Sequence, residues 1–191
     1  MKVEKLNSFR LHKKKSIDLM KNIIFLDIDG VLNCELHYHS AQFEDYKTNG
    51  DKKDEMLYHT SQISKERIEM LNKLCEETDT QIVVSSTWRS SKTIEELQEM
   101  FNACGGTFTV LDKTGHCDCR TRGCEIHEWL EKNTKKHFEV EYYDFYRYAI
   151  IDDDSDMLLN QQSHFFQTDN YAGLTPTICY KIKRFFTHKT F

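Results

Sequence analysis

The sequence has few of the residues and segments that mark linkers, membrane spans or basic binding surfaces. Only one of its 191 residues is proline and seven are glycine, and we find no internal repeat or low-complexity linker, which argues against separate domains on flexible tethers. No apolar run approaches the length of a membrane span, so no membrane partner is expected. The formal net charge of -5 excludes a chain that is basic overall and selects nucleic acid by charge alone.

What is present is typical of one globular domain. Hydrophobic residues make up 39% and charged residues 30% of a chain long enough to bury a sizeable core. The seven cysteines are an odd number, and the first residues do not resemble a secretion signal. We therefore expect reduced thiols in a cytoplasmic protein.

One stretch, residues 23–32, organises the rest of the chain. The four apolar residues from Ile23 to Leu26 predict a strand buried on both faces. Asp27 and Asp29 follow it on the same side of the backbone, and Gly30 permits a sharp turn. Because two like charges at the end of a buried strand repel each other and lose hydration, a divalent cation is expected there. Mg²⁺ prefers such carboxylate oxygens.

Strands and helices alternate along the rest of the sequence. Strand patterns occupy residues 81–85, 108–111, 148–151 and 164–168, and helix patterns follow Ser64, the Thr93–Glu96 capping box, Arg122 and Thr175-Pro176. This alternation predicts an α/β fold with a mainly parallel sheet and helices on both faces.

Two segments do not fit that alternation. Residues 1–21 are polar and basic, and we predict an N-terminal extension, either a short amphipathic helix or a loose arm, ahead of one domain over 22–191. Residues 33–62 lack clean periodicity, and we predict a small irregular lid over the site.

Three of the expected strands end in polar residues that would share one edge of the sheet: Asp27 and Asp29, Ser85 and Ser86, and Asp152 and Asp153. This set suits phosphoryl transfer. One carboxylate attacks phosphorus, a second moves a proton, hydroxyl and cationic donors hold the phosphoryl oxygens, and Mg²⁺ neutralises the charge.

These segments resemble motifs I, II and IV of the haloacid dehalogenase (HAD) superfamily. More narrowly, the segment Ser85-Ser86-Thr87-Trp88-Arg89, the segment that begins at Arg122 and the run Gly173-Leu174-Thr175 are similar to the HAD domain of the Swiss Army Knife RNA-repair type. The likeness covers roughly residues 22–186. It implies a Rossmann-like three-layer α/β/α sandwich that is capless or has a small lid.

The resemblance also implies roles for single residues. Asp27 would be the nucleophile and a Mg²⁺ ligand, and Asp29 the general acid/base whose backbone carbonyl also binds the metal. Ser85 would donate a hydrogen bond to the transferring phosphoryl group. Asp152 would be a metal ligand, and Asp153 would assist directly or through water.

The cationic residue of motif III is expected at Arg122, with Arg120 as the rival. Arg89, directly after the serines, is a candidate for clamping a phosphate bidentately, with Ser86 beside it as a further substrate contact. Ordinary surface charge is the alternative for each arginine.

A cluster of soft ligands precedes and enters the helix expected after Arg122: His116, Cys117, Cys119, Cys124 and His127. Zinc could take four of them, although their spacing matches no zinc module that we can name. Buried or idle thiols are the alternative.

We therefore expect a Mg²⁺-dependent phosphomonoester hydrolase that acts through an aspartyl-phosphate. An open site favours a phosphate on a large molecule, such as a nucleotide or an RNA or DNA end. The alternatives are a phosphatase for a small metabolite or phosphoprotein, and a non-catalytic nucleic-acid- or protein-binding module on a HAD scaffold. The sequence leaves the oligomeric state open.

Overall fold

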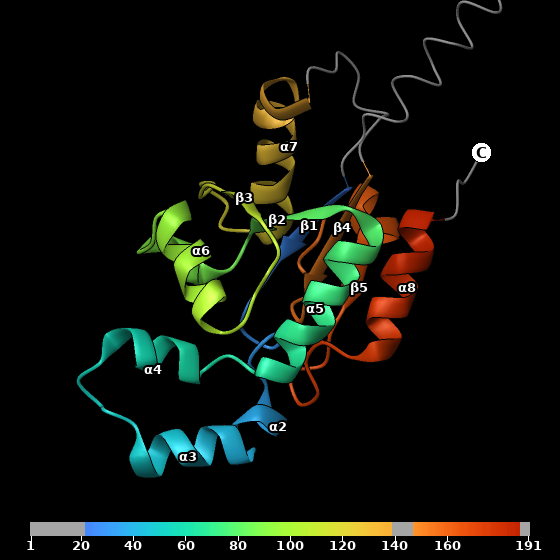
Figure 1. Cartoon of the computed structure of the whole chain (residues 1–191). Helices are drawn as coiled ribbons and strands as arrows, with labels where there is room; N and C mark the ends of the chain where they lie inside the picture. Colours follow the sequence, from blue (N-terminus) through green and yellow to red (C-terminus); the bar gives the residue numbers. More distant parts are fainter. Residues whose placement is uncertain (1–21, 139–146, 188–191) are drawn as a thin grey trace, which may run out of the picture.

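The computed structural model describes residues 22–138 and 147–187, so the predicted extension over 1–21 lies outside them (Figure 1). Within these ranges five strands form one sheet in the order β3-β2-β1-β4-β5, and every adjacent pair is parallel. The strands are β1 (Asn22–Leu26), β2 (Thr80–Val84), β3 (Val110–Lys113), β4 (Arg147–Asp152) and β5 (Phe165–Gln167). The predicted α/β fold with a parallel sheet is confirmed.

Helices cover both faces of this sheet. The helices α5 (Lys65–Thr78), α6 (Ile94–Ala103) and α8 (Pro176–Thr187) pack on one face, and α7 (Arg122–Phe138) packs on the other (Figure 1). Strand β1 supplies both cores by alternation. Ile24 and Leu26 join the larger cluster, whereas Ile23 and Phe25 point to α7. The result is a three-layer sandwich with β1 in the middle of the sheet.

Local sequence signals place several helix ends as expected. Thr93 and Glu96 form the predicted capping box of α6, and the Thr175 hydroxyl accepts the backbone N–H of Ile178 at the start of α8. Ser64 precedes α5, but its hydroxyl accepts from the Arg67 guanidinium rather than from a backbone N–H.

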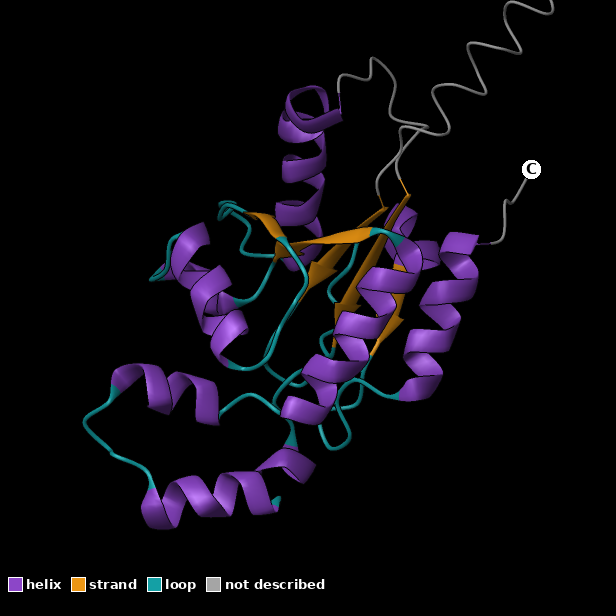
Figure 2. Cartoon of the chain, viewed as in Figure 1, coloured by secondary structure: helices purple, strands orange, loops and turns teal. Residues whose placement is uncertain are grey.

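The prediction of an irregular segment over residues 33–62 is wrong. The segment contains the short helices α2 (Glu35–Tyr38), α3 (Ala41–Asn49) and α4 (Glu55–Ser61), which lie beyond the edge at which the strands end (Figures 1 and 2). Ser40 and Asp54 cap two of them. Since α3 buries none of its side chains, it carries no apolar stripe that a periodicity argument could detect. Across the described ranges, each helix is too short or too polar to cross a bilayer.

Candidate active site

Three carboxylates meet beyond the ends of the central strands. The oxygens of Asp27, Asp152 and Asp153 lie within 4.8 Å of one another. Parallel pairing of β1 with β4 sets Leu26 beside Ile151, so the residues that follow in each strand lie side by side. The structure therefore brings together the distant acidic residues that the sequence analysis singled out.

Gly30 makes room for the third of these carboxylates. Its φ angle is +67°, and a Cβ atom at this position would lie 2.2 Å from Oδ2 of Asp153. A side chain would therefore strain the turn after β1 and displace Asp153. This turn is also held by the Asn33 side chain, whose Oδ1 accepts the Gly30 N–H at 3.0 Å.

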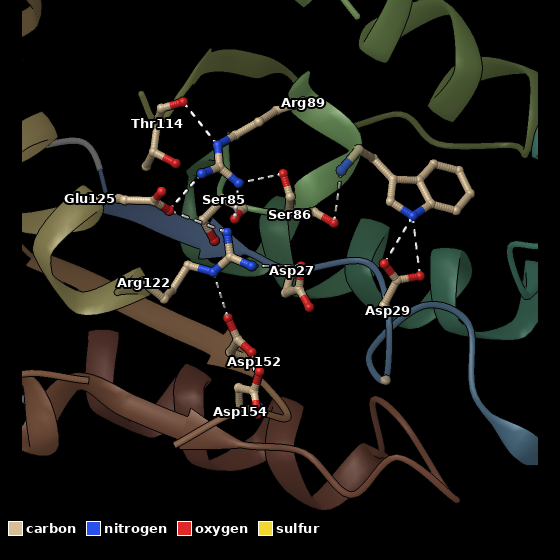
Figure 3. A network of polar contacts seen from close by, with 12 residues as sticks. Asp27, Asp29, Ser85, Ser86, Arg89, Thr114, Arg122, Glu125, Asp152 and Asp154 are labelled. Atoms are coloured by element: carbon tan, nitrogen blue, oxygen red, sulfur yellow. Dashed lines mark hydrogen bonds and ion pairs between the residues drawn. The ribbon is translucent and has the colours of Figure 1, made fainter. Parts of the chain in front are cut away.

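The Arg122 guanidinium lies against two of the three carboxylates (Figure 3). Its Nη2 is 3.6 Å from Oδ1 of Asp27, and its Nε is 3.2 Å from Oδ2 of Asp152. Arg122 is the first residue of α7, where Asp156 accepts its backbone N–H at 2.8 Å. Arg120 lies on the preceding loop, exposed and with a φ angle of +52°. Of the two rivals for the motif III position, Arg122 is therefore the one whose guanidinium reaches the carboxylates.

The environment of the carboxylates favours a bound cation. Burial raises the pKa of Asp27 to about 6 against the opposing effect of Arg122, and burial together with Asp27 raises the pKa of Asp152 to about 7. Oδ1 of Asp27 and Oδ2 of Asp152 are buried and accept no hydrogen bond. Hard carboxylate oxygens that accept no hydrogen bond fit Mg²⁺, although Arg122 lies 3.6 and 3.2 Å from these two atoms.

The two serines follow β2, next to β1 in the sheet. The Ser85 hydroxyl is buried and has no hydrogen-bond partner, which leaves it free to donate to a phosphoryl oxygen. The Ser86 hydroxyl accepts the backbone N–H of Trp88 at 3.5 Å and, by hydrogen bonding to Asp27, lowers the pKa of that carboxyl against the larger effect of burial.

Asp29 lies apart from the cluster of three, on the exposed side of the same turn. The indole Nε1 of Trp88 donates to both of its carboxylate oxygens, at 3.1 and 3.0 Å (Figure 3). The Asn33 amide donates to Oδ1 at 2.7 Å. The sequence alone indicated no role for Trp88 or Asn33. Trp88 belongs to the segment Ser85-Ser86-Thr87-Trp88-Arg89 that resembles the family motif. Its hydrogen bonds to Asp29 are seen only in the structure.

Arg89 occupies the wall of the site rather than its opening. The side chain is 2% exposed, and its Nε, Nη1 and Nη2 donate to protein acceptors on neighbouring segments: the backbone oxygens of Ser85, Ser86, Thr114 and Gly115, and the Glu125 carboxylate at 2.5 Å. With these donors engaged, the predicted phosphate clamp has no free N–H to offer, and Arg89 instead holds the loops together.

Glu125, for which the sequence indicated no role, links Arg122 to the buried Arg89. Its Oε2 lies 2.5 Å from Nη2 of Arg89 and 3.6 Å from Nη1 of Arg122. Glu125 lies one helical turn after Arg122 in α7, a spacing that puts both side chains on one face. It therefore ties the arginine at the carboxylates to the one in the wall (Figure 3).

Comparison with protein-family models matches residues 23–178 to the HAD domain in Swiss Army Knife RNA repair proteins. The chain belongs to this family. The match confirms the resemblance drawn from the motifs and supports a phosphatase-type hydrolase. HAD domains generally use Mg²⁺, and in this HAD domain Asp27, Asp152 and Asp153 form the acidic cluster that could hold it. Comparisons with curated proteins and with solved structures found no match.

Proposed function

We propose that this HAD domain is a Mg²⁺-dependent phosphomonoester hydrolase that forms an aspartyl-phosphate on Asp27. The observation that carries the proposal is the position of Arg122, whose guanidinium contacts both Asp27 and Asp152 beside an unpaired Ser85 hydroxyl. A positive charge and a free hydrogen-bond donor beside the attacking carboxylate stabilise the negative charge on a phosphoryl group during its transfer.

In the proposed reaction an Asp27 oxygen attacks phosphorus, and the bond from phosphorus to the leaving oxygen breaks. Asp29 gives that oxygen its proton and then takes one from the water that hydrolyses the aspartyl-phosphate, which releases inorganic phosphate and restores Asp27. Ser85 and Arg122 hold the phosphoryl oxygens. Asp27, Asp152, Asp153 and the Asp29 carbonyl would bind Mg²⁺, which supplies charge neutralisation.

A groove beside Asp29 favours a substrate that carries a nucleobase. Its volume is about 430 Å³, and aromatic side chains from the lid and from the segment after β2 line it: Tyr38, Tyr58, His59 and Trp88. The His59 and Trp88 rings are 5.6 Å apart, and Lys92 supplies a positive charge. Aromatic rings that stack on bases, next to a cation that attracts phosphates, are typical of single-stranded nucleic-acid sites. We therefore propose terminal phosphates of nucleotides or polynucleotides as substrates.

Replacing Tyr58 with alanine tests this substrate class. Because stacking on one aromatic residue contributes about 1–3 kcal/mol per base, KM for 3′- or 5′-phosphorylated oligonucleotides should rise about 10-fold, whereas KM for a sugar phosphate should stay unchanged. The control is Tyr180→Ala, a similarly exposed tyrosine on α8. Preferred turnover of sugar phosphates or phosphoproteins, with no effect of Tyr58→Ala on oligonucleotides, would instead favour the alternative substrates.

The Trp88→Phe variant tests whether the indole N–H positions Asp29. Phenylalanine keeps an aromatic ring beside His59 but removes both hydrogen bonds to the Asp29 carboxylate. General acid–base catalysis contributes roughly 10²–10⁴-fold to the rate. An Asp29 carboxylate that is held less firmly should therefore lower kcat about 10- to 100-fold with little change in KM. The control is Trp129→Phe, which also loses an indole hydrogen bond, to Asp112, on the opposite face of the sheet. An unchanged kcat in Trp88→Phe contradicts the role.

Mg²⁺ should stabilise the protein more strongly as pH rises. The raised pKa values of Asp27 and Asp152, about 6 and about 7, mean that the native state binds more protons than the unfolded chain between about pH 4 and 7. The metal-free protein therefore loses stability as pH rises through this window, and the cation relieves the repulsion once both groups are charged. The increase in Tm on adding Mg²⁺ should be small at about pH 5 and large at about pH 8. Equal increases at both pH values, or the same pattern in Asp152→Asn, would refute the metal assignment.

A further inference from the structure

A second cluster of metal-binding side chains lies outside the carboxylate site. The Sγ atoms of Cys117, Cys119 and Cys124 all lie within 4.8 Å of one another, and those of Cys117 and Cys119 are 2.9 Å apart. Two of these cysteines belong to the loop after β3, and the third lies in the first turn of α7. The other cysteines of the described ranges are not part of this group.

We propose that Cys117, Cys119 and Cys124 bind a zinc ion, with the fourth ligand position open to solvent at the exposed Cys119. Thiolates about 2.3 Å from zinc lie about 3.8 Å from one another in a tetrahedral site, which is below the 4.8 Å within which the three sulfurs lie. Cys117 and Cys119, whose sulfurs are 2.9 Å apart, would move apart on binding the metal. A disulfide needs a sulfur–sulfur distance of about 2.05 Å and would use two of the sulfurs, leaving the third without a function. Convergence of three sulfurs is thus better explained by a metal.

The histidines that the sequence analysis grouped with these cysteines have other partners. Nδ1 of His116 lies 3.4 Å from Glu125, and its Nε2 lies 3.1 Å from the Ser90 hydroxyl. Nε2 of His127 lies 3.4 Å from Glu131 on the next turn of α7. The hypothesis of a mixed Cys/His site is thereby replaced by a site of three cysteines.

The three cysteines differ in exposure, with Cys119 exposed and Cys124 partly buried. Cys117 itself is 8% exposed, so part of the cluster is shielded from solvent.

A metal here would fix the loop that leads to Arg122. Cys117 lines a cavity of about 540 Å³ together with Arg120 and Arg122, and Cys124 lies two residues after Arg122 in α7. Tying the loop to the first turn of α7 restricts where this turn can move. The zinc ion would therefore act as a positioning element for the guanidinium at the carboxylates.

The test measures metal content and the cobalt spectrum rather than turnover, so its outcome is independent of the proposed phosphatase activity. The full chain, purified under reducing conditions, is loaded with Zn²⁺ or Co²⁺ in excess Mg²⁺, dialysed and assayed for bound metal. We expect one tightly bound ion per chain and, with Co²⁺, the intense thiolate-to-metal charge-transfer absorption. The single variants Cys119→Ser and Cys124→Ser should lose both signals, whereas Cys179→Ser, a partly exposed cysteine on α8, should keep them.

Two results would overturn the proposal. One is metal binding of equal strength in Cys119→Ser, which would assign the ion to the carboxylates. The other is absence of thiolate-bound cobalt in a folded, fully reduced protein, with a mass spectrum that shows a Cys117–Cys119 disulfide before reduction. Far-UV circular dichroism of each variant establishes that a lost signal is not a lost fold.

Discussion

Replacing Asp27 with asparagine should lower turnover of phosphate monoesters by at least about 10⁴-fold and leave the protein folded. Asparagine keeps the shape of the side chain but offers a neutral amide oxygen, which is a poor nucleophile and a weaker metal ligand. Stability should not suffer, since the substitution removes one of the two buried carboxylates that repel each other beside Arg122. Initial rates with p-nitrophenyl phosphate and with phosphorylated oligonucleotides in Mg²⁺ measure the effect.

The matched control for this variant is Asp45→Asn, an exposed position on α3. It should keep full activity. A folded Asp27→Asn protein with activity within tenfold of the original would show that the nucleophile lies elsewhere. If no phosphate ester is hydrolysed by either form and oligonucleotide binding survives in Asp27→Asn, the non-catalytic binding module becomes the better interpretation.

The Arg89→Met variant should lower the free energy of unfolding by about 3–5 kcal/mol, the usual effect of breaking a buried ion pair. Methionine fills part of the volume but leaves the buried Glu125 carboxylate and several loop carbonyls without their donor. For a domain of this size the change corresponds to a fall in Tm of roughly 10 °C or more. Denaturant and thermal unfolding measure it.

Two further variants give this prediction its controls. Arg184→Met, at an exposed position on α8, should change stability by less than about 0.5 kcal/mol. The double variant Arg89→Met with Glu125→Gln should recover part of the loss, because the uncompensated buried charge is gone. A Tm for Arg89→Met equal to that of the original protein would mean that the guanidinium does not hold the loops, and would reopen its assignment as a phosphate clamp.

The parallel sheet and the acidic site were predictable because the signals are local and repeated. The apolar run before Asp27 and the one before Asp152 each define a buried strand, and the carboxyl ends of parallel strands share an edge. The helices within residues 33–62 were not predictable in the same way. Helix α3 buries no side chain, so its sequence has no period to detect and it depends on caps such as Ser40.

The three arginines show most clearly what could not be predicted from the sequence. From the sequence Arg89, Arg120 and Arg122 have the same charge and lie near the same motifs. In the structure one is sealed in the wall, one is exposed and one lies against Asp27. Which guanidinium reaches the carboxylates depends on where α7 begins and on the acceptors that surround each side chain, and these come from segments distant in sequence.

The sequence by itself therefore determined the fold class, the family and the carboxylates at the strand ends, because strand burial and motif spacing depend on residues that are close together in the chain. Only the tertiary structure decided that Arg122 is the cation at the site, that Trp88 holds Asp29 and that three cysteines converge. Each of these is a contact between separate segments, and its geometry depends on packing that no local pattern encodes.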